Sequence, residues 1–116
     1  MATRNSWTRD EFIYCLAEYA ALSDAQKRVP PASVLERVSR NTGRSLGSIS
    51  LRFANFNSVD PTFTTKGLKG MSGGGATVKA IWHEFSNNEG WLDQSKLLSY
   101  IAVQWFEVLA EGESNG

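Results

Sequence analysis

Three polar side chains that could read DNA bases recur at helical spacing in the middle of this chain. Ser48, Arg52 and Asn55 occupy positions i, i+4 and i+7, so an α-helix brings them onto one face. An arginine guanidinium donates hydrogen bonds to the O6 and N7 atoms of guanine, and an asparagine amide pairs with the N6 and N7 atoms of adenine. With this face turned outward, the sequence predicts base contacts in the major groove of double-stranded DNA.

Basic and hydroxyl side chains near this segment are further candidate contacts. Arg44 and Ser45 precede the helix, where free backbone amides and the positive end of the helix dipole attract an anion. The alternative is that all these side chains simply solvate an exposed surface. We expect phosphate contacts from Arg37, Arg40, Lys66 and Lys69, and base or groove contacts from Arg44, Ser48, Arg52 and Asn55.

The distribution of charge predicts a polarised surface, although the 116 residues carry no net charge. Residues 37–79 hold seven basic side chains and one acidic side chain, whereas residues 80–116 hold one lysine and six acidic side chains. A basic surface of this kind steers a polyanion to one side of a molecule. The alternative interpretation is that both segments form ordinary solvated faces.

The apolar pattern predicts one all-α domain of about five helices, with a frayed tail from about residue 111. Thr8 and Glu11 form a capping box before the first helix. Ser33 and Glu36 form a second one, although the second helix can instead begin at Pro31. The expected helices cover about 9–22, 33–42, 46–57, 77–85 and 93–110.

Only residues 43–45 separate the second and third helices. A turn of this length that contains a glycine is typical of a helix-turn-helix, in which the second helix enters the major groove. The face of the third helix that is expected to pack inward consists of Leu46, Ile49, Phe53 and Phe56.

The segment 62–75 is expected to be a loop with a possible small β-hairpin wing. Residues 62–65 have the composition of a short strand, and five glycines follow. A plain flexible connection is the alternative. The segment does not match a phosphate-binding loop, because no Gly-Lys-Ser/Thr follows at the required spacing.

The last predicted helix is apolar on most of its sides. Such a helix is either central to the core or covered by another protein surface. In the second case it forms the interface of a homodimer or binds a protein partner, with aromatic anchors at its centre. The candidate interface residues are Ile101, Trp105, Phe106 and Leu109.

The sequence offers no residues for catalysis, a metal or a cofactor. His83 is the only histidine, and the neighbouring Glu84 points about 100° away from it on a helix. Cys15 lies on the apolar face of the first helix and is expected in the core. We therefore expect a binding protein with no catalytic residue, no metal and no cofactor.

The sequence also predicts a cytoplasmic protein that does not enter a membrane. No segment approaches the roughly 20 apolar residues of a membrane helix. Residues 1–10 are polar and lack the apolar run of a signal peptide. The lone Cys15 cannot form an internal disulfide, which fits a reducing compartment.

Several motifs follow one another along residues 6–86, of which Asn55-Phe56 and Asp60-Pro61 are the most specific. They are Trp7-Thr8-Arg9-Asp10-Glu11-Phe12, the run from Arg44 to Pro61, Gly67-Leu68 and Ile81-Trp82-His83-Glu84-Phe85. This order resembles the N-terminal helical domain of bacterial HNH-type restriction endonucleases, especially those that attack modified DNA.

The resemblance implies a DNA-binding or assembly role in restriction, phage defence or transcription control. It adds weight to Arg44, Ser48, Arg52 and Asn55 as DNA contacts. Cleavage does not carry over, because an HNH centre needs several His and Asn residues around a metal and this chain has one His. The second hypothesis is therefore an interaction module that docks on a nuclease or dimerises.

Overall fold

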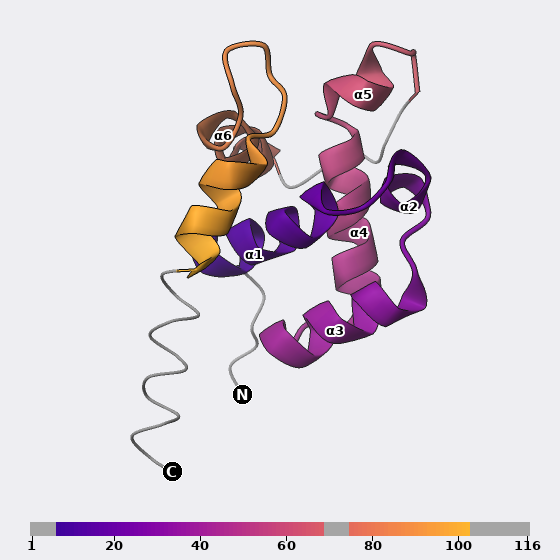
Figure 1. The fold of residues 1–116 in the computed structure, drawn as a ribbon. Coiled ribbons are helices and arrows are strands. Elements are labelled where there is room, and N and C mark those ends of the chain that lie inside the picture. The colour runs from indigo at the N-terminus through magenta and orange to yellow at the C-terminus, as the bar shows by residue number, and fades with distance from the viewer. Residues whose placement is uncertain (1–6, 69–74, 103–116) are drawn as a thin grey trace.

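The computed structural model describes residues 7–68 and 75–102, and these residues are all-helical, as predicted (Figure 1). The only β-type pairing among them is an isolated antiparallel bridge between Ser86 and Leu92. The helices are α1 (Arg9–Ala20), α2 (Asp24–Arg28), α3 (Ala32–Thr42), α4 (Leu46–Asn57), α5 (Pro61–Thr64), α6 (Gly75–Glu84) and a helix over 94–102.

Local capping interactions set the start of several helices. The Thr8 hydroxyl accepts a hydrogen bond from the Glu11 amide at 3.2 Å, and the Glu11 carboxylate accepts one from the Thr8 amide at 2.9 Å. This confirms the predicted capping box. α3 begins after Pro31 without a side-chain cap, so the predicted capping box at Ser33 is wrong. Gly43 ends α3 with φ of 77°, a conformation that favours glycine.

The short helix α2 was not among the predicted helices. Its start is a capping box in which the Ser23 hydroxyl and the Gln26 side chain each bond the other residue's amide at 3.2 Å. None of its residues is buried, so it lacks the apolar stripe from which helices are predicted.

The core lies where α4 meets α1, α3 and α6 (Figure 1), and Tyr19 belongs to it. The Tyr19 ring makes edge-on contacts with Phe53, Phe56 and Trp82 at centroid distances of 5.8, 5.3 and 6.1 Å. Tyr19 is fully buried, and its hydroxyl donates to Asp60 Oδ2 at 2.6 Å. One aromatic side chain from α1 therefore joins α4 and α6.

The predicted strand over residues 62–65 is wrong, because Pro61–Thr64 forms α5. The Asp60 carboxylate accepts from the Thr62 amide at 2.9 Å, and Pro61 occupies the first turn, where its fixed φ suits a helix. Phe63 then packs into the interior. The remainder of the proposed wing lies largely in residues 69–74, outside the described residues.

The last described helix packs inward. The Asp93 carboxylate accepts from the Lys96 amide at 3.2 Å and caps this helix, as predicted. Leu97 is fully buried and Ile101 is 9% exposed, so Ile101 belongs to the core and not to a surface interface. The other predicted interface residues, Trp105, Phe106 and Leu109, lie outside the described residues.

Along the described residues, no helix combines the length and the apolar character needed to cross a bilayer.

We expect Phe53→Ala to lower the free energy of unfolding by about 3–5 kcal/mol, because it empties a fully packed site beside Tyr19. The exposed control Glu36→Ala should change it by less than about 0.5 kcal/mol. Urea unfolding followed by circular dichroism measures both. Equal effects of the two substitutions would contradict the assigned core.

Candidate functional site

The one charged residue of α4 turns toward α1. The Arg52 guanidinium lies 4.9 Å from the centre of the Trp7 indole and 4.7 Å from that of the Phe12 ring. Its Nη1 donates to Asn55 Oδ1 at 2.8 Å. Arg52 is thus held between two aromatic rings and an amide, an arrangement that favours a cation while covering it.

Arg44 joins the same group from the turn that precedes α4. Its guanidinium carbon lies 5.4 Å from the Trp7 ring centre, and its Nη2 pairs with Glu11 Oε1 at 2.7 Å. The Arg44 side chain is only 7% exposed. The Trp7 indole N–H donates to the Ser48 hydroxyl oxygen at 3.2 Å. We call this group the Trp7 cluster, which comprises Trp7, Glu11, Phe12, Arg44, Ser48 and Arg52.

The Trp7 cluster contains two guanidiniums and one carboxylate. Partial burial lowers the pKa of Arg52, and the neighbouring charge of Arg44 adds to this effect. The Arg52 Nε is buried and has no hydrogen-bond partner. The aromatic rings therefore supply much of the stabilisation that offsets the desolvation of Arg52.

Asn55 is buried beneath this cluster. It is 1% exposed, and its amide oxygen accepts the hydrogen bond from Arg52. The prediction that Arg44 and Asn55 face outward is therefore wrong, because both are buried. Arg52 is partly buried, and its guanidinium packs on the Trp7 and Phe12 rings.

Arg37 is occupied by an acidic partner on α1. Its Nε and Nη2 donate to the two carboxylate oxygens of Glu18 at 2.9 and 2.7 Å. The Tyr14 hydroxyl donates to Glu18 at 2.7 Å and accepts from the Asn41 side chain at 2.7 Å. Burial of the Tyr14 hydroxyl raises its pKa to about 12. Arg37 thus belongs to a polar network that joins α1 to α3.

Of the other predicted contacts, Arg40 and Ser45 lie near the start of α4 and Lys66 lies beyond its end. Arg40 is exposed on α3, and Ser45 is exposed at the start of α4, where its hydroxyl caps the Ser48 amide. Lys66 follows α5 at the opposite end of α4, and Figure 1 shows α3 and α5 at the two ends of this helix. α4 has 12 residues, so these ends are about 18 Å apart. Lys69 lies outside the described residues.

The solvent-facing side of α4 carries no charge. Leu46 and Leu51 are 46% and 44% exposed. Gly47 and Ser50 are also exposed, and Ala54 is half-buried. We call these five residues the α4 outer face. The α4 outer face offers apolar and small neutral groups, in contrast to the polar face that the sequence suggested.

The prediction that Leu46 packs inward is wrong. Ile49, Phe53 and Phe56 are buried as expected. Three helical positions correspond to about 300°, so Leu46 is offset by about 60° from Ile49, toward the exposed Ser50. Leu46 consequently lies at the solvent edge of the apolar stripe.

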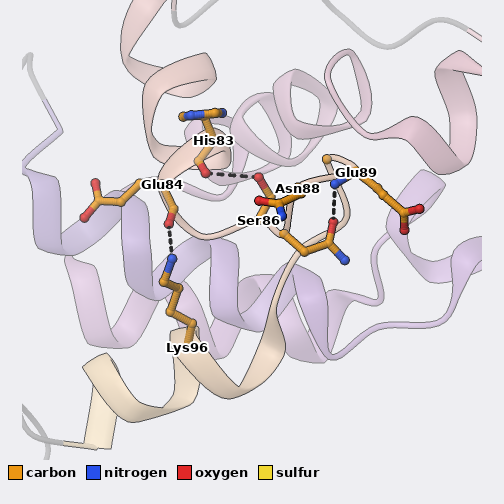
Figure 2. A pocket seen from close by; sticks show the side chains of 8 residues that line it. His83, Glu84, Ser86, Asn88, Glu89 and Lys96 are labelled. Atoms are coloured by element: carbon orange, nitrogen blue, oxygen red, sulfur yellow. Dashed lines mark hydrogen bonds between the residues drawn. The ribbon is translucent and has the colours of Figure 1, made fainter.

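A separate polar hollow of about 640 Å³ lies over the loop that follows α6 (Figure 2). Its side chains are largely engaged with nearby backbone: the Ser86 hydroxyl donates to the His83 carbonyl at 3.0 Å, and Lys96 donates to the Glu84 carbonyl at 2.9 Å. The Glu84 carboxylate pairs with Arg9. His83 is exposed, and its ring points away from Glu84 in Figure 2, so the two do not form an acid–base pair.

Comparison with protein-family models, with curated proteins and with solved structures finds no match for this chain.

We expect Arg52→Ala to lower the free energy of unfolding by about 1–2 kcal/mol, because it removes the cation and its stem from between two rings. Asn55→Ala should lower the free energy of unfolding by about 1–3 kcal/mol, because it deletes a buried hydrogen-bonding group. The exposed Arg40→Ala is the matched control, with a change below about 0.5 kcal/mol. A cost for Arg52→Ala no larger than for Arg40→Ala in chemical denaturation would show that Arg52 has no structural role.

A second expectation concerns acid pH. Burial alone would raise the pKa of Glu18, but hydrogen bonds from Arg37 and Tyr14 outweigh it and lower the pKa. Glu18 therefore stabilises the fold above its unfolded pKa of about 4.3, and this contribution is lost as pH falls through the lower folded pKa.

Glu18→Gln should consequently reduce the loss of stability between about pH 6 and pH 3 relative to the unchanged chain. The exposed Glu36→Gln is the control, with an unchanged pH profile. Unfolding midpoints in urea across this pH range measure both. An identical profile for Glu18→Gln and the unchanged chain would rule out this contribution.

Proposed function

We propose that this chain is a protein-interaction module that dimerises through the α4 outer face. The observation that carries the proposal is that Arg52, the single charged residue of α4, packs on the Trp7 ring, while Leu46 and Leu51 are exposed. A helix face with two exposed leucines and no charge suits another protein surface better than a phosphate backbone.

A second copy of the chain is the partner that the charge distribution favours. The α4 outer face has no charge, so two copies meet there without repulsion between like groups. The chain as a whole has no net charge, which removes the long-range repulsion that keeps strongly charged proteins apart. In a two-fold dimer each face pairs with itself, so the two exposed leucines become four.

The size of the face sets the expected strength. Gly47, Ser50 and Ala54 are small, which allows two helices to approach at the short end of the usual range of about 8–10 Å between axes. One 12-residue helix buries less than the roughly 800 Å² per partner of a stable complex. We therefore expect a weak dimer that forms and dissociates with concentration.

DNA binding has less support, because the geometry on which it depended is absent. Arg44, Arg52 and Asn55 belong to or lie beneath the Trp7 cluster, and Arg37 is paired with Glu18. The resemblance to the helical domain of restriction endonucleases remains compatible with docking on a nuclease, which is an outcome of the test below.

Sedimentation velocity over about 10–500 µM should show a rising average mass that fits a monomer–dimer equilibrium. Leu51→Glu should weaken the dimer at least about tenfold, because two carboxylates would then enter one apolar contact. The matched control Lys79→Glu changes an exposed residue of α6 and should leave the equilibrium unchanged. A monomer at every concentration, or equal effects of both substitutions, would reject dimerisation through α4 and leave a different protein as the partner.

A titration of a fluorescent 20-base-pair duplex at about 50 mM salt tests the competing function. We expect no saturable binding, because Arg44 and Arg52 are held in the Trp7 cluster and Arg37 is paired with Glu18. Binding that weakens steeply with salt and is lost in Arg40→Glu would instead establish DNA as the partner.

A further inference from the structure

A small cavity of about 140 Å³ lies away from the α4 outer face, near α2 and the start of α5. It brings together both kinds of charge, hydrogen-bonding side chains and two indoles. The lining residues on which the argument depends are Lys27, Asp60, Thr62, Trp82, Trp91 and Gln94.

The negative charge in this cavity is a buried carboxylate that forms no ion pair with any described residue. Asp60 is 2% exposed. Its Oδ2 accepts from the Tyr19 hydroxyl at 2.6 Å and its Oδ1 accepts from the Thr62 amide at 2.9 Å. Within the described residues, no basic side-chain nitrogen lies within 4.0 Å of this carboxylate. Both oxygens retain lone pairs for a further donor.

The positive charge is the Lys27 ammonium, which lies 5.4 Å from the centre of the Tyr19 ring. Lys27 is half-buried on α2, and no acidic group of the described residues lies within 4.0 Å of its Nζ. Lys27 and Asp60 therefore line one cavity without forming an ion pair with each other. Asp60 is buried and Lys27 is partly exposed, so the cavity presents two opposite charges at separate positions, which is complementary to a ligand that carries both.

The two indole side chains and the volume of the cavity indicate the size and the apolar part of that ligand. The Trp82 side chain is buried, and its indole N–H donates to the Gly90 carbonyl at 2.9 Å, which fixes the ring. Trp91 is 41% exposed beside the cavity. The cavity is half open and polar, and its volume of about 140 Å³ is close to the roughly 150 Å³ that holds benzene in a closed apolar cavity, so it suits a ligand of about six non-hydrogen atoms. Alanine has a similar number of non-hydrogen atoms.

We propose that this cavity binds a small zwitterion of the α-amino acid class, with its ammonium group toward Asp60 and its carboxylate toward Lys27. The two indoles contact its short apolar side chain. This site goes beyond the proposed dimerisation and does not depend on it, because none of its residues belongs to the α4 outer face.

The test uses the full chain and L-alanine as the probe, with the indole N–H resonances followed by nuclear magnetic resonance. We expect saturable shifts of the Trp82 and Trp91 resonances, while that of Trp7 stays in place because Trp7 lies in a separate cluster. N-acetyl-L-alanine lacks the ammonium and L-alanine methyl ester lacks the carboxylate. Each should bind at least about tenfold more weakly, because one charged wall then remains unpaired.

Variants assign the two charges. Lys27→Met should weaken L-alanine binding at least about tenfold, whereas the control Lys79→Met, at an exposed position of α6, should not change it. Asp60→Asn tests whether the carboxylate is needed for binding. If this substitution unfolds the chain, the result for Lys27→Met decides the test. The proposal is overturned if L-alanine gives no saturable shift, if either analogue binds as well as L-alanine, or if Lys27→Met binds it normally.

Discussion

The contact of the Trp7 indole with two arginine guanidiniums decides which sides of α1 and α4 remain available to other molecules. Arg52 lies between the Trp7 and Phe12 rings, and Arg44 lies beside the same indole while pairing with Glu11. A guanidinium is weakly hydrated and stacks well on aromatic rings, so it tolerates such a site where a lysine ammonium would lose more hydration. The consequence is that the Arg52 side of α4 packs against Trp7 and Phe12, while the α4 outer face, which carries no charge, is exposed to solvent.

Local signals predicted most of the fold, because they act within a few residues. The capping box at Thr8 and the glycine at position 43 set helix ends without help from distant segments. The same type of signal precedes α2 at Ser23, but a five-residue helix with no buried side chain has no periodic apolar pattern to accompany it. α5 shows the opposite case, since Asp60 and Pro61 start a helix in a segment whose Thr and Phe content favours a strand.

The candidate site could not be predicted in the same way, because its partners are distant in sequence. Periodicity placed Phe53 and Phe56 inside correctly, but it gives no sign that Trp7, 41 residues before Ser48, contacts Ser48 and Arg52 beside that stripe. The Arg44–Glu11 pair likewise spans 33 residues. A count of charges along the chain gives no sign that Arg37 and Arg44 are paired. In the fold, Arg37 pairs with Glu18 and Arg44 pairs with Glu11. Linear charge clusters are therefore weak guides to a surface when the acidic partners come from other segments.

The charges that line the cavity near α2 differ from those of Arg37 and Arg44, because these two arginines are in ion pairs. Arg37 and Arg44 form ion pairs with Glu18 and Glu11 of α1, and these pairs connect segments that are distant in the sequence. Lys27 and Asp60 differ, because each contacts Tyr19 and neither forms an ion pair within the described residues. The Asp60 carboxylate is held by neutral donors, the Tyr19 hydroxyl and the Thr62 amide. Tyr19 thus joins the core to a cavity that the Asp60 carboxylate and the Lys27 ammonium line without pairing with each other, and a ligand with both charges would pair with each of them.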